Sequence, residues 1–228
     1  MQEYIRAIPY KHQEIAFKEA ISRKEFALLM EQGTGKTLVA IAVMGYRARS
    51  HGVSRILVVA PLSVVPFWKK ELARYANFAH SVVDLTKSSE AERVSALRLG
   101  MKLENGPVIA LINYESTWRF YKGLTDWAPQ MIVCDESQKI KRYKAKQSKA
   151  MHYLGDNAIF KLILTGTPVT QSPLDVWSQY RFLNVRIFGD NFFRFRNRYA
   201  VLGGWQFKQV VAYKGLEELA AKAHMIAY

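Results

Sequence analysis

Cysteine, histidine and long hydrophobic runs are all scarce in this chain of 228 residues. A single cysteine, Cys134, excludes an internal disulfide and fits a reducing compartment. Five scattered histidines provide no cluster of metal ligands, and no G-x-S-x-G motif marks a serine nucleophile. The longest apolar region, ILVVAPLSVVPFW, is broken by Pro61, Ser63 and Pro66 and is too short to span a bilayer. Residues 1–12 lack the apolar segment of a signal peptide, so we predict a cytoplasmic protein without a membrane partner.

Acidic residues are also few, since 19 Asp and Glu stand against 33 Lys and Arg, a net charge of +14. An excess of this size favours a polyanionic partner, nucleic acid first, although a basic surface without such a partner is the alternative. Half of the residues are hydrophobic, which excludes a disordered chain and is enough for one substantial core.

Short apolar runs alternate with longer amphipathic stretches along most of the chain. The runs are continuous rather than alternating, which indicates strands covered on both faces. In residues 63–76 the side chains of Val64, Trp68, Leu72 and Tyr75 recur at helical spacing. We therefore predict an α/β domain over residues 1–185, with a mostly parallel sheet and helices on both faces. The expected strands are 26–30, 55–60, 80–85, 107–112, 131–136 and 161–166.

The pattern changes after about residue 185, where the chain becomes aromatic and basic. Gly203 and Gly204 separate two strand-like runs, which predicts a hairpin. We expect residues 186–228 to form a small helix and hairpin appendage of the same domain. The aromatic and branched residues that share one parity there, and so one expected face, are Trp205, Phe207, Val211 and Tyr213.

The segment MEQGTGKT, residues 30–37, follows an apolar run and precedes a helical pattern, as a phosphate-binding loop does. Glycines let backbone N–H groups turn toward phosphate oxygens, and a helix N-terminus adds positive potential. The strict pattern has glycine where this chain has Met30, so a glycine-rich turn with an exposed lysine is the alternative. The residues expected to bind nucleotide are Gly33, Thr34, Gly35, Lys36 and Thr37, with Lys36 on the phosphates and Thr37 on Mg²⁺.

Two further motifs end apolar runs. MIVCDESQ delivers Asp135 and Glu136, and adjacent carboxylates at a strand end can hold Mg²⁺ and activate water. LTGTP, residues 164–168, is a turn with capping hydroxyls and is a weak signal alone. Because ligands bind at the carboxyl edge of open α/β sheets, we expect these segments to meet the phosphate loop.

Taken in order, the motifs resemble the first RecA-like domain of a superfamily two helicase, on the Swi/Snf-type DNA translocase branch. The resemblance covers nearly the whole chain, weakest after about residue 190, and the overall form is similar to compact phage and bacterial members. The segments that carry it are YKHQ (10–13), MEQGTGKT (30–37), VVAPLSVVPFWKKEL (58–72), INYES (112–116), CDESQKIK (134–141) and LTGTPVTQSPLDVWSQYRFL (164–183).

The resemblance implies ATP and Mg²⁺ as cofactors and a role for each matching residue. Gln13 would read the adenine, Asp135 would hold Mg²⁺ with Thr37, and Glu136 would be the catalytic base. Gln138 stands where the family usually has histidine, and it can still hydrogen-bond to the TGT loop. The residues that would couple nucleotide to nucleic acid are Gln138, Thr165, Gly166 and Thr167; those that would contact one strand's backbone are Pro61, Leu62, Ser63, Asn113 and Tyr114. The run KIKRYKAKQSK (139–149) is either a DNA-facing strip or a solvated helix face.

The resemblance also implies a second RecA-like domain, and no later segment provides one. We therefore expect a fragment of a longer DNA-dependent ATPase or translocase, nearly inactive by itself, and we expect the DNA it acts on to be duplex. One alternative is a one-domain ATP-binding scaffold or regulatory module without motor activity. Another is an RNA helicase domain, which the APLSVVPFW and DVWS segments disfavour.

Overall fold

A six-stranded parallel sheet forms the centre of the molecule in the computed structural model, which describes residues 1–86, 89–102, 106–207 and 209–228. The strand order is β1-β6-β5-β2-β4-β3, and every neighbouring pair is parallel. All six predicted strands are confirmed, with no end displaced by more than two residues. They are β1 (Glu25–Leu28), β2 (Arg55–Ala60), β3 (Ser81–Asp84), β4 (Val108–Asn113), β5 (Met131–Asp135) and β6 (Phe160–Leu164).

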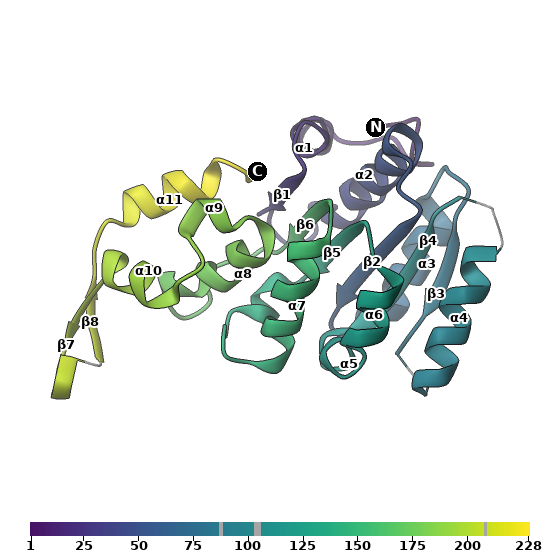
Figure 1. The fold of residues 1–228 in the computed structure, drawn as a ribbon. Coiled ribbons are helices and arrows are strands. Elements are labelled where there is room, and N and C mark those ends of the chain that lie inside the picture. The colour runs from purple at the N-terminus through teal and green to yellow at the C-terminus, as the bar shows by residue number, and fades with distance from the viewer. Residues whose placement is uncertain (87–88, 103–105, 208) are drawn as a thin grey trace.

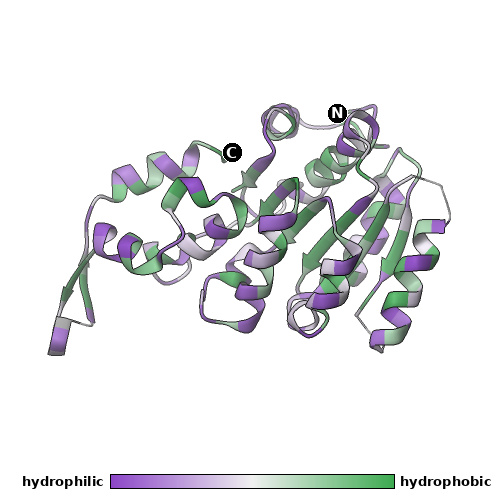
Figure 2. Cartoon of the chain, viewed as in Figure 1, coloured by the Kyte–Doolittle hydropathy of each residue, from purple (hydrophilic) through white to green (hydrophobic). Residues whose placement is uncertain are grey.

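Helices cover both faces of this sheet, as predicted (Figure 1). Along β2, Ile56 and Val58 enter one core while Leu57 and Val59 enter the other, which explains the unbroken apolar runs. Figure 2 shows the central strands of the sheet as mostly hydrophobic. The first core includes residues of α1 (Lys11–Ile21), α2 (Lys36–His51) and α3 (Val65–Tyr75); the second includes residues of α4 (Glu90–Lys102), α5 (Tyr114–Arg119), α6 (Tyr121–Trp127), α7 (Lys146–Asn157) and α8 (Val176–Leu183).

The remainder of the chain extends from one side of the sheet domain (Figure 1). Buried Phe195 and Tyr199 share a core with Phe182, so the packing continues across the predicted boundary at 185. The chain then returns to the sheet, where Tyr228 exchanges backbone hydrogen bonds of 2.9 and 2.7 Å with Ala27 and Leu29 beside β1. The elements of this part are α9 (Val185–Phe188), α10 (Phe192–Tyr199), β7 (Ala200–Gly203), β8 (Gln209–Tyr213) and α11 (Leu216–His224).

The predicted hairpin is present as the antiparallel pair β7 and β8. The expectation that Trp205 shares a strand face with Val211 and Tyr213 is wrong. Residues Trp205–Phe207 form a short 3-10 turn, η3, because Gly203 and Gly204 end the first strand before them. Two other 3-10 turns, η1 (Ser137–Ile140) and η2 (Pro173–Asp175), follow β5 and β6. In the part of the chain that is described, no helix combines the length and apolarity needed to cross a membrane.

His152 gives the fold a specific pH dependence. Its Nε2 lies 2.9 Å from the carbonyl oxygen of Ser178 and 3.0 Å from its hydroxyl, joining α7 to α8. Burial lowers the pKa of His152 to about 4, and the charge of Arg181 adds to that effect. In the unfolded chain His152 therefore binds a proton near pH 6.5, whereas in the folded chain it does so only near pH 4.

Above pH 6.5, we expect titration of His152 to leave the free energy of unfolding unchanged. As the pH drops from 6.5 toward 4, the free energy of unfolding should fall. The contribution of this one group to the slope is about 1.4 kcal/mol per pH unit. His152→Gln keeps a donor for Ser178 but cannot be protonated, so its profile should be flatter over that range. Urea unfolding at several pH values measures both slopes, and parallel profiles would contradict the assignment.

Candidate nucleotide site

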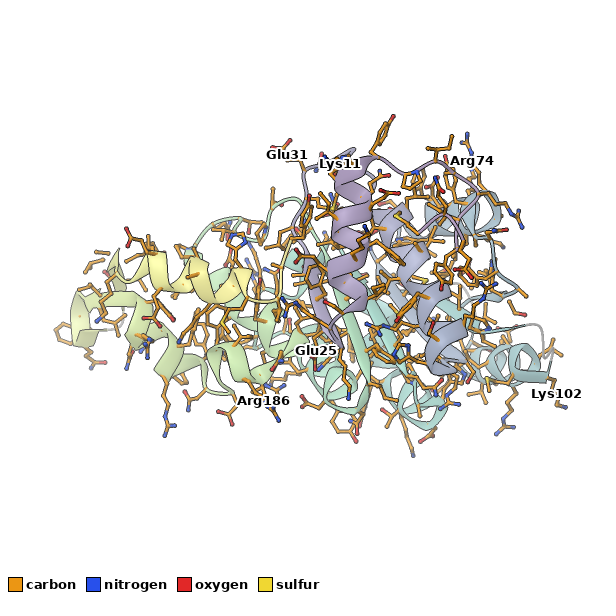
Figure 3. The ribbon with its side chains drawn as sticks, turned by 90° about the horizontal axis from the view of Figure 1, so that it is seen from above. Lys11, Glu25, Glu31, Arg74, Lys102 and Arg186 are labelled. Atoms are coloured by element: carbon orange, nitrogen blue, oxygen red, sulfur yellow. The ribbon has the colours of Figure 1, made fainter. Side chains whose placement is uncertain are left out.

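The sequence motifs meet at one edge because the sheet is parallel. The phosphate loop follows β1, Pro61–Ser63 follows β2, and Asp135 and Thr165 stand at the ends of β5 and β6. Parallel strands bring all these carboxyl ends to the same edge, where ligands bind in α/β sheets. Seen from above (Figure 3), Glu31 of the phosphate loop lies at that end beside Lys11, while Glu25 at the start of β1 lies at the opposite end.

The phosphate loop has the backbone that anion binding requires. Gly33 and Gly35 adopt φ of 78° and 84°, which a residue with a β-carbon rarely does. Lys36 opens α2, and its Nζ donates to the carbonyl oxygens of Met30 (2.8 Å) and Glu31 (2.9 Å). The ammonium therefore lies within the loop, on acceptors that phosphate oxygens can replace.

Met30 explains its own departure from the strict pattern. It is not among the residues of positive φ, so its backbone does not need glycine. Its side chain is buried in the first core. The substitution therefore leaves the shape of the loop to Gly33 and Gly35.

Asp135 is a buried carboxylate with two hydrogen-bond donors. The indole Nε1 of Trp68 donates to its Oδ2 at 2.8 Å, and the Glu136 N–H donates to its Oδ1 at 2.9 Å. Burial raises the pKa of Asp135, and the Trp68 hydrogen bond opposes that rise. Each carboxylate oxygen can accept more than one hydrogen bond but has one donor here, so a lone pair remains on each for a cation.

Glu136 has an unusual backbone, with φ of 50° and ψ of 54°. This left-handed conformation costs on the order of 1 kcal/mol for a residue other than glycine, and such strain concentrates at functional sites. Gln138 donates from Nε2 to Glu136 Oε2 at 2.6 Å and accepts at Oε1 from the Thr165 hydroxyl at 2.8 Å. The hydrogen bond expected from Gln138 to the TGT loop is thus present.

The TGT loop lies against the phosphate loop. Thr167 N–H donates to the Thr165 hydroxyl at 3.0 Å. A β-carbon added to Gly166 would lie 3.3 Å from the Met30 carbonyl oxygen, so the two loops are close to contact. A hydrogen-bonded path therefore runs from Glu136 through Gln138 and Thr165 to Thr167.

A cavity of about 490 Å³ joins these groups. Its lining combines the phosphate loop and both carboxylates with apolar and aromatic side chains such as Val64, Phe67 and Tyr75, a mixture that suits a nucleotide. Sequence reasoning did not predict the wall that α3 provides, and burial raises the pKa of its Glu71 while Arg74 opposes the rise. The lining residues are Ala7, Gln32, Gly33, Gly35, Lys36, Thr37, Leu38, Val64, Phe67, Glu71, Tyr75, Asp135 and Glu136.

Gln13 lies behind the phosphate loop and does not line this cavity. Its Nε2 donates to the Thr34 carbonyl oxygen at 2.9 Å, and its Oε1 accepts from the Tyr10 N–H at 2.9 Å. The residue is 4% exposed. In this conformation Gln13 positions the phosphate loop, and adenine recognition by it stays a prediction.

The five residues predicted to contact nucleic acid divide into two groups. Leu62 and Ser63 are exposed and Pro61 is half-buried, all at the carboxyl edge. Asn113 and Tyr114 are buried, and the Tyr114 hydroxyl donates to the Asp135 carbonyl oxygen at 2.7 Å. Tyr114 therefore supports Asp135 from within the core and presents no surface to a strand.

The oxygen donors at the site fit Mg²⁺. Among the described residues, no group of three or more His, Cys, Asp or Glu could hold a metal ion. Thr37 and Asp135 instead offer a hydroxyl and a carboxylate, the donors with which Mg²⁺ completes its shell from phosphates and water.

The fold and the site together define a RecA-like domain with a phosphate-binding loop. The chain belongs to the SNF2-related domain family, whose model matches residues 15–220. The predicted family is confirmed; its phage or bacterial origin stays a prediction.

Similar proteins include both solved structures and sequence relatives. The SWI2/SNF2 ATPase core of Sulfolobus solfataricus, solved in complex with dsDNA, superimposes with a TM-score of 0.78 at 27% identity, covering 100% of this chain and 46% of that one. A Caenorhabditis elegans homolog of the SWI/SNF-related chromatin regulator subfamily A-like protein 1 is 29% identical over 95% of this chain. Mouse chromodomain-helicase-DNA-binding protein 1-like is 29% identical over 65% of it. The chain spans 30% and 16% of these two relatives' own lengths.

Trp68→Phe should weaken the Mg²⁺-dependent part of nucleotide binding by about tenfold. The change keeps the buried ring but removes the N–H that fixes Asp135, a hydrogen bond to a charged group. ATP affinity without Mg²⁺ should stay near wild type. Calorimetry of ATP binding with and without Mg²⁺ measures both.

Trp177→Phe is the matched control, because the buried Trp177 indole N–H has no hydrogen-bond partner in the described structure. If the two variants behave alike, Trp68 has no specific role in holding Asp135.

Proposed function

We propose that this chain is the N-terminal ATP-binding domain of a DNA-dependent ATPase that translocates on DNA. The observation that carries the proposal is the hydrogen-bonded path from Glu136 through Gln138 and Thr165 to Thr167. It joins the residue proposed to activate water with a loop at the same edge as the proposed DNA contacts.

In the nucleotide site, Lys36 and the backbone of the phosphate loop would bind ATP phosphates. Thr37 and Asp135 would hold Mg²⁺, which neutralises phosphate charge when bound. Glu136 would orient the attacking water and accept its proton. The Gln138 amide donates to Glu136 Oε2 and so orients the carboxylate that would receive the proton.

Three observations support DNA as the partner. The net charge is +14, and Leu62 and Ser63 are exposed at the carboxyl edge. The similar Sulfolobus ATPase core was solved with dsDNA. We propose contacts to the backbone of one strand by Pro61, Leu62 and Ser63, and leave out the buried Asn113 and Tyr114.

We also propose that a second RecA-like domain in a longer protein completes the motor. No arginine is among the described residues lining the cavity, although phosphoryl transfer in related systems uses one. The wall formed by Lys36, Asp135 and Glu136 would then be closed by the other domain, and the coupling residues Gln138, Thr165, Gly166 and Thr167 would respond to that closure.

Lys36→Ala should remove detectable binding of ATP·Mg²⁺ to residues 1–228, because the phosphates lose their main cationic partner. Calorimetry checks this, and Lys18→Ala, an exposed lysine on α1, is the control. Unchanged affinity in the Lys36 variant would be incompatible with a phosphate-binding loop at this site.

In a longer protein that contains both RecA-like domains, duplex DNA should stimulate ATP hydrolysis, and Glu136→Gln should lower it by at least about 100-fold with ATP still bound. Residues 1–228 alone should hydrolyse ATP slower by about 10³ or more, for want of the arginine. Steady-state ATPase assays with and without DNA measure each case, and Glu115→Gln, an exposed carboxylate outside the cavity, is the control.

Two results would contradict the proposal. DNA-stimulated turnover by residues 1–228 alone would mean that no second domain is needed. Absence of DNA stimulation in the longer protein would favour an ATP-binding scaffold.

A further inference from the structure

The β7–β8 hairpin projects from the body of the molecule beyond α10 (Figure 1). It is a two-stranded antiparallel ribbon, pairing Ala200 with Tyr213 and Gly203 with Gln209. Every residue of β8 is exposed. An isolated ribbon of two strands has marginal stability in water, and contact with a partner would stabilise this one.

Its exposed surface is apolar and aromatic in a way that the fold alone does not require. Trp205, in the turn at the tip, is 81% exposed, and Val211 is 60% exposed. Val201, Val210 and Tyr213 of the same ribbon are exposed as well. Exposed apolar side chains grouped on one small ribbon indicate an interaction site, whereas a single one does not.

The charge of this part of the chain indicates which partner fits. Residues 191–216 contain five basic residues and no acidic one, whereas the whole chain has 19 acids. Arg194 and Lys214, one on each side of the ribbon in the sequence, are both exposed. Arg198 is different, because it pairs with Glu218 at 2.7 Å. Residues 191–216, basic and without an acid, therefore complement a polyanion.

We propose that the β7–β8 ribbon is a second contact for duplex DNA, separate from Pro61–Ser63. The DNA major groove admits a two-stranded ribbon, and apolar side chains contact the thymine methyl groups there. Trp205 would make the base contact, and Arg194 and Lys214 would pair with phosphates. The proposal rests on the proposed DNA partner and adds a surface to it.

The ribbon is also tied to the proposed coupling loop. The Tyr213 hydroxyl donates to the Ser172 hydroxyl at 2.9 Å. Ser172 belongs to the segment that Asp175 organises by accepting from Thr170 and Gln171, the continuation of the TGT loop. The base of the ribbon is therefore hydrogen-bonded to the segment that continues the TGT loop, which links the proposed DNA contact to the proposed coupling loop.

The test is DNA binding by residues 1–228, measured by fluorescence anisotropy with a labelled duplex about two helical turns long. Trp205→Ala should weaken binding at least about fivefold, which is about 1 kcal/mol, because the aromatic contact with the bases is lost. Trp205→Phe should retain most of the affinity. Tyr121→Ala, which removes an exposed aromatic on α6, is the matched control and should bind as wild type.

The salt dependence tests the cationic part. Lys214→Gln should reduce the slope of log affinity against log salt by about 0.9, the loss of one phosphate contact, whereas Lys18→Gln should not. Thermal unfolding of each variant checks that the fold is retained.

The outcomes separate the two proposals. Failure of the wild-type chain to bind DNA would contradict the proposed function. Binding that is equal for wild type, Trp205→Ala and Tyr121→Ala would overturn the ribbon contact alone. Loss of self-association in Trp205→Ala, seen by sedimentation without a change in DNA affinity, would assign the ribbon to a second copy of the chain and also overturn it.

Discussion

Parallel pairing of all six strands is the constraint on which the site depends. Segments as distant in sequence as residues 30–37 and 165–167 meet only because β1 pairs with β6 in the same direction. The β6–β5 pair then places Asp135 beside the same loop. Parallel sheets occur almost only with both faces covered, so the two cores are a condition of the site as much as of the fold.

Asp135 is a buried carboxylate at the end of β5 and depends on hydrogen-bond donors from its surroundings. A buried carboxylate is costly unless donors surround it, and here they come from different elements. Trp68 reaches it from α3, while Tyr114 from α5 holds its carbonyl oxygen. The helices on the two faces are therefore locked to the end of β5 by hydrogen bonds as well as by packing. Because α3 follows Pro61–Ser63 in the chain, movement of that loop would move α3 and change the Trp68 hydrogen bond to Asp135.

The amino-acid sequence predicted the features that depend on residues close together in the chain. Continuous apolar runs indicated buried strands, and Gly33, Gly35 and Lys36 indicated an anion-binding turn, because each signal lies within a few residues. It did not predict the partners of Trp68, Gln13 or Tyr114. The spacing of apolar residues places Trp68 on an apolar helix face, and nothing nearby in the chain shows that its N–H meets a carboxylate 67 residues away. The hairpin was predicted from Gly203 and Gly204, but the parity rule failed at Trp205 because it applies only within strands.

Gln138 shows how a departure from the family pattern can be consistent with the geometry. A carboxamide has a fixed donor and a fixed acceptor, and here Nε2 faces Glu136 while Oε1 faces the Thr165 hydroxyl. Reversing the amide would place its oxygen against the Glu136 carboxylate and lose that bond, so the orientation is determined. A histidine at this position titrates near neutral pH and would change its charge beside Glu136. Glutamine keeps the same two hydrogen bonds without that change, so the link between the carboxylate and the TGT loop is independent of protonation at this residue.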